Sequence, residues 1–413
     1  MTEAQSPHRV DRPLNNGNTT GLRTVSLVII LGALTALGPL TVSLYLPALP
    51  TITSEFGASA TMVQLTLTGT LAGLALGQVV IGPCSDIYGR RRPIIVGTAI
   101  HVSASVLCFF ATSIPMLSAL RVLQGFGAAA AGVVAMAVVR DLYVGHSAAV
   151  MLSRVILVIG VAPIIAPSVG GLLLSFMPWR GVFLFLAVLG VAALSIAVRA
   201  MPETLPPQSR RSPGVRGILC TYAMLARDRP FSLFVLIGGV VRIAQWGYIA
   251  GSSFVIQYQF GLSVGAYGLL FAAGAVVITV ASQLNVLLLV RWSPLQVARW
   301  SLLAAVLAGA AFVLMAATNT GGLGGFEIPL LIVLGSIGLV TPNVPALALS
   351  RHGEAAGGAS ALLGFTQFAA AAAAAPLVGV LGTDSLAVSS VMTGAAVLAF
   401  CLLFLVRNTH VVS

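Results

Sequence analysis

The chain contains no lysine, and charged residues make up only 8% of its 413 positions. Soluble globular domains carry about 25% charged residues, so this low fraction excludes an ordinary soluble fold. In the absence of lysine, the formal net charge of +11 comes entirely from arginine. These arginines stand one to three at a time beside apolar segments, without the basic patch that nucleic-acid binding requires, so we expect no nucleic-acid partner.

Cysteine is also scarce and scattered. Cys84, Cys108, Cys220 and Cys401 form no C-x-x-C pair, so they indicate neither a disulfide framework nor a metal site. The sequence has no H-E-x-x-H motif and no phosphate-binding G-x-x-x-x-G-K-[ST] loop, which argues against a zinc protease and against ATP as an energy source. We therefore expect a protein that is not an enzyme and that holds no cofactor and no metal.

What the chain has in abundance is apolar sequence. Hydrophobic residues make up 58% of it, and its mean hydropathy is +1.03. Segments of roughly 18 to 25 apolar residues can cross a bilayer as helices, and shorter alternating barrel strands do not fit them. The sequence predicts an all-α membrane protein with twelve spans at 25–47, 60–83, 93–112, 116–138, 149–174, 181–200, 231–252, 264–288, 300–317, 328–349, 358–381 and 387–406.

The arginines orient these spans. With a cytoplasmic N-terminus, the arginines between spans fall on the cytoplasmic side except for Arg180, as the positive-inside rule requires. The polar segment 201–230 divides the chain into two sets of six spans. We predict a cytoplasmic tail at 1–24, a six-helix bundle at 25–200, a cytoplasmic linker at 201–230, a second bundle at 231–406 and a cytoplasmic tail at 407–413.

The loop "IGPCSDIYGRRRPIIVG" at 81–97 concentrates charge between two spans. Arg90 and Arg91 could simply anchor the topology. Topology does not explain Asp86 or Gly89, because acids contribute little to orientation and glycine is required where the backbone turns tightly. We expect Asp86 to accept hydrogen bonds from an arginine and from the N-terminus of another helix, and so to hold the inner face shut.

The pattern G-x-x-x-D-x-x-G-R-R, formed by Gly82, Asp86, Gly89, Arg90 and Arg91, resembles the loop signature of the major facilitator superfamily. Further segments resemble the drug-exporting Bcr/CflA group within it: "LYLPALPTI" at 44–52, "RVLQGFGAAAAGVVAMAVVRDLY" at 121–143, "VAPIIAPSVGGLL" at 161–173, "ETLPP" at 203–207 and "AGGASALLGFTQF" at 356–368. The resemblance implies two six-helix bundles that export small amphiphilic antibiotics by alternating access in a bacterial inner membrane, with proton coupling.

Two arginines lie inside predicted spans, where burial of a charge is costly. Arg121 matches the fourth-span arginine that the superfamily associates with proton and substrate coupling, and Gln124 lies one turn away. Arg242 in the seventh span matches no family motif. It either lines the cavity and meets a polar or anionic substrate group, or pairs with a carboxylate or with backbone carbonyls.

The fifth span contains two prolines and two glycines, so we expect a kinked and closely packed helix. These residues are Pro163, Pro167, Gly170 and Gly171. A packing feature common to membrane helices would explain them equally well. The resemblance adds that such a kink favours export.

Proton coupling is where the sequence departs from the resembled group. Ser43 occupies the position where that group has an aspartate, and we expect no other acid deep in a span. Candidate proton sites are Glu327, Asp141 and Asp86, although each also suits a membrane boundary. Predicted cavity residues, some of which could equally be interface aromatics or interhelical hydrogen bonds, are Tyr45, Gln124, Trp246, Tyr248, Asn343 and Gln367.

We therefore expect a monomeric secondary transporter that handles a small drug, protons and membrane lipid. The alternative is a facilitator or importer of a small metabolite without proton antiport, which the replacement of an acid by Ser43 makes reasonable. A membrane enzyme and a sensor without transport are weaker alternatives.

Overall fold

A computed structural model describes residues 17–143, 145–210, 215–350 and 355–406, and this described part contains helices and connections but no strand. Twelve helices are long and apolar enough to cross a membrane, which confirms the predicted number. They are α1 (Gly17–Ser43), α3 (Ala60–Tyr88), α4 (Arg91–Phe109), α5 (Ile114–Leu142), α6 (Gly145–Leu174), α7 (Arg180–Ala200), α9 (Arg229–Phe254), α10 (Val264–Leu288), α11 (Pro294–Thr318), α12 (Gly322–Leu349), α13 (Ala356–Leu381) and α14 (Ser385–Leu405).

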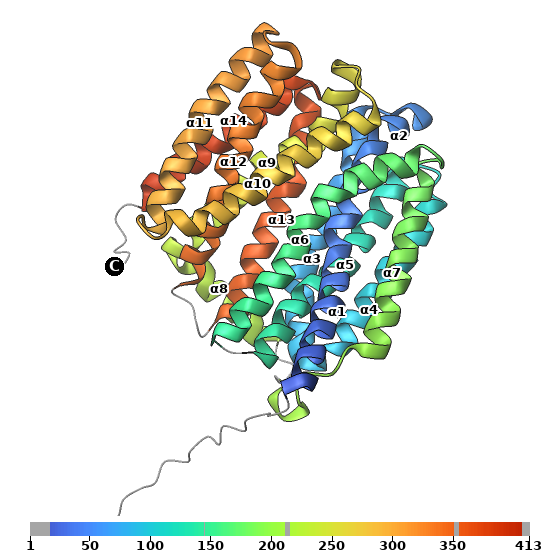
Figure 1. The fold of residues 1–413 in the computed structure, drawn as a ribbon, viewed down its shortest axis with the longest axis vertical. Helices are drawn as coiled ribbons and strands as arrows, with labels where there is room; N and C mark the ends of the chain where they lie inside the picture. Colours follow the sequence, from blue (N-terminus) through green and yellow to red (C-terminus); the bar gives the residue numbers. More distant parts are fainter. Residues whose placement is uncertain (1–16, 144, 211–214, 351–354, 407–413) are drawn as a thin grey trace, which may run out of the picture.

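The helices form two groups, which Figure 1 shows side by side. The first group contains α1 and α3 to α7, and the second contains α9 to α14. The groups meet along two helix pairs, α3 with α13 and α6 with α10. These four helices therefore define the interface between the groups.

Small residues allow the closest helix contacts within the first group. A Cβ atom on Gly73 of α3 would lie 2.0 Å from the carbonyl oxygen of Val122, and one on Gly125 of α5 would lie 2.0 Å from that of Thr70. Only glycine permits this approach, so α3 and α5 pack backbone against backbone, as helices in lipid commonly do.

Serine and aspartate side chains begin several of the helices. Ser113 accepts a hydrogen bond from the backbone N–H of Met116 at the start of α5, and Asp384 accepts one from Ala387 at the start of α14. Such N-caps satisfy backbone donors that would otherwise be orphaned. Polar residues at the predicted turns thus set where these spans begin.

Several boundaries differ from the predicted ones. Helix α1 begins at Gly17, inside the segment predicted as a tail, whereas 1–16 and 407–413 lie outside the described residues. The first span continues beyond residue 47 through a 3-10 turn, η1 (Leu46–Ala48), and helix α2 (Leu49–Phe56). A proline lies near the start of each of these two elements. Proline is favoured at a helix start, because the N–H group that it lacks would be unpaired there anyway.

The polar connection and the seventh span contain elements that were not predicted. The connection includes the short turn η2 (Pro207–Ser209) and helix α8 (Val215–Arg227). Helix α9 continues into a π-helical turn, η3 (Val255–Gln259), before the chain reverses.

We call the end of the molecule where α3 meets α4 the Arg90 end, and the opposite end the Glu55 end.

Candidate functional site

Hydrogen bonds join the two helix groups near the Glu55 end. On α3, the Oγ1 atoms of Thr61 and Thr68 donate to the carbonyl oxygens of Gly379 and Ala372, each at 2.9 Å, and Gln64 Nε2 donates to Ala250 O at 3.2 Å. From the second group, Tyr258 donates to Pro50 O at 2.9 Å and Gln257 donates to Pro47 O at 3.5 Å. We call these five contacts the outer seal.

Helices α3 and α13 run antiparallel and stay in contact as far as Gln78. A Cβ atom on Gly364 of α13 would lie 2.7 Å from Gln78 Oε1, so these two residues pack tightly. Toward the Arg90 end from that contact, both helices line a cavity. The contact between Gln78 and Gly364 therefore forms the inner limit of the cavity.

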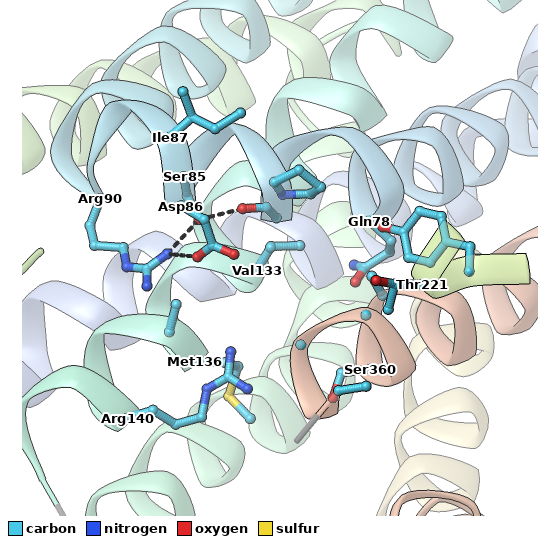
Figure 2. Close-up of a pocket in the computed structure, with 18 of the residues that line it drawn as sticks. Gln78, Ser85, Asp86, Ile87, Arg90, Val133, Met136, Arg140, Thr221 and Ser360 are labelled. Atoms are coloured by element: carbon cyan, nitrogen blue, oxygen red, sulfur yellow. Dashed lines mark hydrogen bonds and ion pairs between the residues drawn. The ribbon is translucent and has the colours of Figure 1, made fainter. Parts of the chain in front are cut away.

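The cavity has a volume of about 1040 Å³ and extends to the Arg90 end. Figure 2 shows side chains around it, among them Asp86 of α3, Arg140 of α5, Thr221 of α8 and Ser360 of α13. A cavity of this size accommodates a small drug-like molecule. Because one wall comes from each helix group, a relative movement of the groups would change its access.

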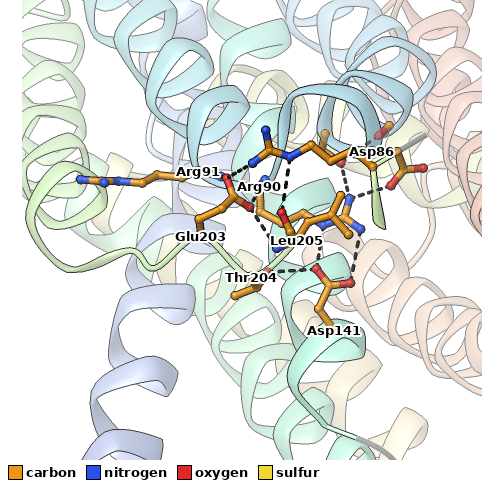
Figure 3. A network of polar contacts seen from close by, with 10 residues as sticks. Asp86, Arg90, Arg91, Asp141, Glu203, Thr204 and Leu205 are labelled. Carbon is orange, nitrogen blue, oxygen red and sulfur yellow. Dashed lines mark hydrogen bonds and ion pairs between the residues drawn. The ribbon is translucent and has the colours of Figure 1, made fainter. Parts of the chain in front are cut away.

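Arg90 lies at the centre of an ionic network at this end (Figure 3). Its side chain is buried, with Nη1 at 2.7 Å from Asp86 Oδ1 and Nε at 2.8 Å from Asp141 Oδ2. Burial lowers the pKa of Arg90, but the hydrogen bonds and charges of Asp141 and Asp86 outweigh this and raise its pKa above the ordinary value. Arg90 thus ties α3 to α5 as a permanent cation.

Glu203, from the connection after α7, completes the network. Its carboxylate accepts backbone hydrogen bonds from Arg90 at 2.8 Å, Leu205 at 3.0 Å and Arg91 at 3.4 Å. Burial raises the pKa of Glu203, but these donors and the charge of Arg210 outweigh it and lower its pKa overall. The N-terminus of α4 is therefore capped by a carboxylate from a distant segment.

This arrangement differs from the role expected for Asp86. Asp86 does accept a hydrogen bond from an arginine, as expected, but it lines the open cavity, and Glu203 occupies the helix N-terminus instead. Gly89 has φ of +88°, and a Cβ atom there would lie 2.3 Å from Glu203 Oε2. A tight turn and a close approach thus both require glycine at this position. Gly82 also lines the cavity, and Arg91 donates to the carbonyl oxygen of Val198.

Arg121 of α5 is completely buried within the first helix group. Its Nη1 donates to Thr41 O at 3.0 Å and to Gln124 Oε1 at 2.7 Å, and its guanidinium lies 4.4 Å from the ring centre of Tyr45. Gln124 Nε2 in turn donates a hydrogen bond to Ser105 Oγ at 2.7 Å. Arg121, Gln124 and Tyr45 therefore form one enclosed polar cluster and do not line the cavity.

Arg242 of α9 lies in the second helix group and is half-buried. Its Nη1 donates to Gln245 Oε1 at 2.6 Å, and its Nε donates to Gln367 Oε1 of α13 at 3.4 Å. No carboxylate among the described residues forms an ion pair with it. The structure thus brings together Arg242 and Gln367, two of the predicted substrate residues, and adds Gln245.

The remaining predicted substrate residues are spread out. Ser43 is buried at the end of α1, and Trp246 is half-buried one turn after Arg242. Tyr248 is buried and stacks on Phe271, with ring centres 5.4 Å apart. Asn343 donates to Asn285 Oδ1 at 2.7 Å and so links α12 to α10. These residues do not share one surface with the cavity.

Pro163 and Pro167 lie inside α6, where the two following glycines make close contacts. A Cβ atom on Gly170 would lie 2.3 Å from Leu44 O, and one on Gly171 would lie 3.2 Å from Val264 of α10. The expected close packing is therefore present. At Gly171 it occurs at the interface between the two groups.

Sequence reasoning missed some of the residues that matter here. The roles of Glu203 and Gln64 could not be predicted, because the Arg90 N–H and the Ala250 carbonyl that they bind are more than 100 positions away in sequence. Gln245 could have been found, since it lies three residues after Arg242 on one helix face.

Residues 261–265 read G-L-S-V-G, the spacing of a hydrolase nucleophile elbow. Ser263, however, caps α10 by accepting a hydrogen bond from Ala266 at 3.2 Å.

Two helix groups, joined at one end and parted by a drug-sized cavity at the other, are typical of membrane transporters built from two helix bundles. Residues 31–376 match the profile of the Major Facilitator Superfamily, and the chain belongs to this family of non-enzymatic membrane transporters.

Individual relatives cover nearly the whole chain. The uncharacterized MFS-type transporter YdgK of Bacillus subtilis is 33% identical over 92% of this chain and 95% of its own. The bicyclomycin resistance protein homolog of Haemophilus influenzae is 27% identical, covering 91% and 94%. The fold is similar to the partially occluded inward open conformation of the xylose transporter XylE from E. coli, with a TM-score of 0.72, 14% identity and coverage of 93% and 97%.

Proposed function

We propose that this protein is a secondary active exporter of small amphiphilic drugs of the amphenicol or bicyclomycin kind, located in the bacterial inner membrane. The observation that carries the proposal is the cavity of about 1040 Å³ at the Arg90 end, opposite the outer seal. The likeness to a relative named a bicyclomycin resistance protein homolog supports the choice of substrate.

The orientation follows from the arginines. The arginines of the described connections lie at the Arg90 end, except for Arg180, which lies at the Glu55 end. By the positive-inside rule, this distribution supports a cytoplasmic Arg90 end and cytoplasmic termini. The cavity then faces the cytoplasm, where an exporter takes up its substrate. Export requires the outer seal to open while the Arg90 end closes around the substrate.

We propose that proton entry drives this cycle and that Glu327 of α12 carries the proton. Among the acids that the structure describes, Glu327 is the one classed as buried, with 8% of its surface exposed, and its Oε1 atom has no hydrogen-bond partner. Asp86 and Asp141 are instead held by Arg90. Tyr248, which is buried in the same helix group, also has an unpartnered hydroxyl. A carboxyl near the Glu55 end with free hydrogen-bonding capacity is suited to exchange a proton with the outside.

Two measurements test the proposal. Expression in a host that lacks its own drug pumps should raise resistance to chloramphenicol or bicyclomycin. Inside-out vesicles should accumulate the drug when their interior is acidified, and Glu327→Gln should remove this dependence on the pH gradient, whereas Glu327→Asp should keep part of it.

Resistance without any response to the gradient would refute proton coupling and leave drug export in place. No resistance to any antibiotic class would favour the alternative, a metabolite facilitator, which the buried Ser43 in place of an acid also supports.

A further inference from the structure

The two intramembrane arginines have different surroundings, and the difference points to a ligand. Arg121 is sealed on all sides, whereas Arg242 borders a small cavity of about 10 Å³. This cavity is formed by α9, α12 and α13, with Thr341 and Gln367 among its lining residues. A space of that size holds one oxygen atom of a water or a ligand group.

Arg242 lacks a compensating charge. Its only described side-chain partners are the amide oxygens of Gln245 and Gln367, and the described residues provide no acid within ion-pair distance. An unpaired guanidinium at membrane depth is costly. Residues of this kind usually serve function, because a structural role could be filled by a neutral donor.

The two glutamines turn this cation into a donor site. Both amide oxygens face Arg242, so the amide nitrogens of Gln245 and Gln367 remain available as donors, and neither donates to a described residue. The Nη2 atom of Arg242 likewise has no described hydrogen-bond partner, and it is not one of the fully buried polar atoms that lack a partner. A group of donors with net positive charge is complementary to a carboxylate.

The place of this donor group connects it to the transport path. On α13, Ser360 lines the large cavity, Gly364 forms its inner limit with Gln78, and Gln367 follows three residues later. The donor group therefore lies about one helical turn along α13 from the contact that closes the large cavity.

We propose that Arg242, Gln245 and Gln367 form a subsite that binds the carboxylate of an amphiphilic substrate, so that monoanionic drugs are preferred over neutral ones of the same shape. This inference rests on the proposed export function, whose substrate class it narrows. The acid-bearing part of the substrate would occupy the second helix group, and its apolar part would face the larger cavity.

Binding of a matched pair of probes tests the inference: chloramphenicol hemisuccinate, which carries one carboxylate, and the methyl ester of the same compound, which does not. The full chain is placed in nanodiscs of phosphatidylcholine, and affinity is read from the quenching of tryptophan fluorescence, to which Trp246 contributes one turn from Arg242. We expect the wild type to bind the hemisuccinate at least tenfold more tightly than the ester.

Variants separate a binding role from a structural one. Arg242→Gln should remove the preference, Arg242→Lys should keep part of it, and Arg291→Gln, at an exposed arginine between α10 and α11, should leave the ratio of the two affinities unchanged. Equal affinity of the wild type for both probes, or a preference that survives in Arg242→Gln, would overturn the inference. If Arg242→Gln does not fold, Gln367→Leu, which should reduce the preference, takes its place.

Two other outcomes are distinguishable. If phosphatidylglycerol stabilises the wild type but not Arg242→Gln, and abolishes the preference, the occupant is a lipid phosphate and the inference fails. If the wild type confers chloramphenicol resistance but shows no preference, the inference fails while the export function stands. A tenfold preference for the hemisuccinate without resistance to any antibiotic contradicts the export function instead.

Discussion

The two ends of the interface between the helix groups are held in different ways. At the Glu55 end, neutral hydrogen bonds and close glycine contacts join one group to the other. At the Arg90 end, the strong charged contacts of Arg90 and Glu203 stay within the first group, and a cavity separates it from the second. In the proposed cycle, the contacts that must open are therefore the weaker kind, and the ionic network can persist while the groups move.

The energies of the two kinds of contact support this division. A neutral hydrogen bond contributes about 0.5–1.5 kcal/mol, whereas hydrogen bonds to charged groups contribute about 1.5–3 kcal/mol. Opening the outer seal breaks several of the first kind, and each can be replaced by a bond to water. The Arg90 network needs no such exchange, because it links helices of the same group.

The largest effect should come from locking the Glu55 end. In a chain with its four cysteines replaced by alanine, Thr61→Cys with Gly379→Cys should cross-link on oxidation, because a Cβ atom on Gly379 would lie 2.8 Å from Thr61 Oγ1. Transport should stop and return on reduction. As a control, Ile87→Cys with Gly357→Cys, both lining the cavity, should cross-link poorly without substrate. Transport that continues in the locked protein would contradict the need for opening.

The next largest effect should come from disturbing the ionic network. Gly89→Ala forces a side chain into φ of +88° and against Glu203, at a cost of about 1–3 kcal/mol. We expect a lower thermal midpoint and several-fold slower transport, measured on the purified protein and in vesicles. The control is Gly82→Ala, where a Cβ atom would meet only Val133 at 3.9 Å, and equal losses in both variants would count against the network.

A smaller effect should follow from weakening the outer seal by one contact. Gln64→Leu removes the bond to Ala250, which corresponds to about a 2- to 13-fold shift toward the state open at the Glu55 end. Labels on Ser54→Cys and Thr320→Cys would measure the population of that state. Gln257→Leu, which removes the longer contact to Pro47 at 3.5 Å, should shift it less.

The smallest effect concerns the pH dependence of stability. Because the pKa of Glu203 is lowered in the folded protein, its charge stabilises the fold above the ordinary value of 4.5, and this contribution is lost as the pH falls through the folded pKa. The stability difference between the wild type and Glu203→Gln should therefore shrink on acidification. Glu203→Ala should remain less stable at every pH, since it also loses the acceptor for the Arg90 N–H. A difference that does not change with pH would exclude a charge effect.

The sequence predicted the parts of this account that depend on local pattern. Apolar length and the distribution of arginine predicted the twelve spans, and the G-x-x-x-D-x-x-G-R-R pattern indicated the turn at Gly89. The partners of that turn could not be read in the same way, because the capping acid is Glu203 from a distant segment. Long-range contacts depend on the packing of whole helices, which no local pattern encodes.

The same limit separates the two arginines. Both stand out in sequence as charges within apolar spans, and nothing local distinguishes a sealed arginine from one beside a cavity. Only the folded arrangement shows Arg121 beneath Tyr45 and Arg242 between two glutamines. The amphipathic helix α8 was missed for another reason, since it is too short for a span and lies in a segment rich in proline and arginine.

The central claim is that the two ends of the interface open and close in opposition, and distances between paired spin labels test it most directly. One pair at the Arg90 end, Tyr88→Cys with Val290→Cys, and one at the Glu55 end, Ser54→Cys with Thr320→Cys, lie on exposed positions of opposite groups. On addition of chloramphenicol with an imposed pH gradient, the first distance should shorten while the second lengthens. Distances that stay fixed, or that change in the same direction at both ends, would contradict the account.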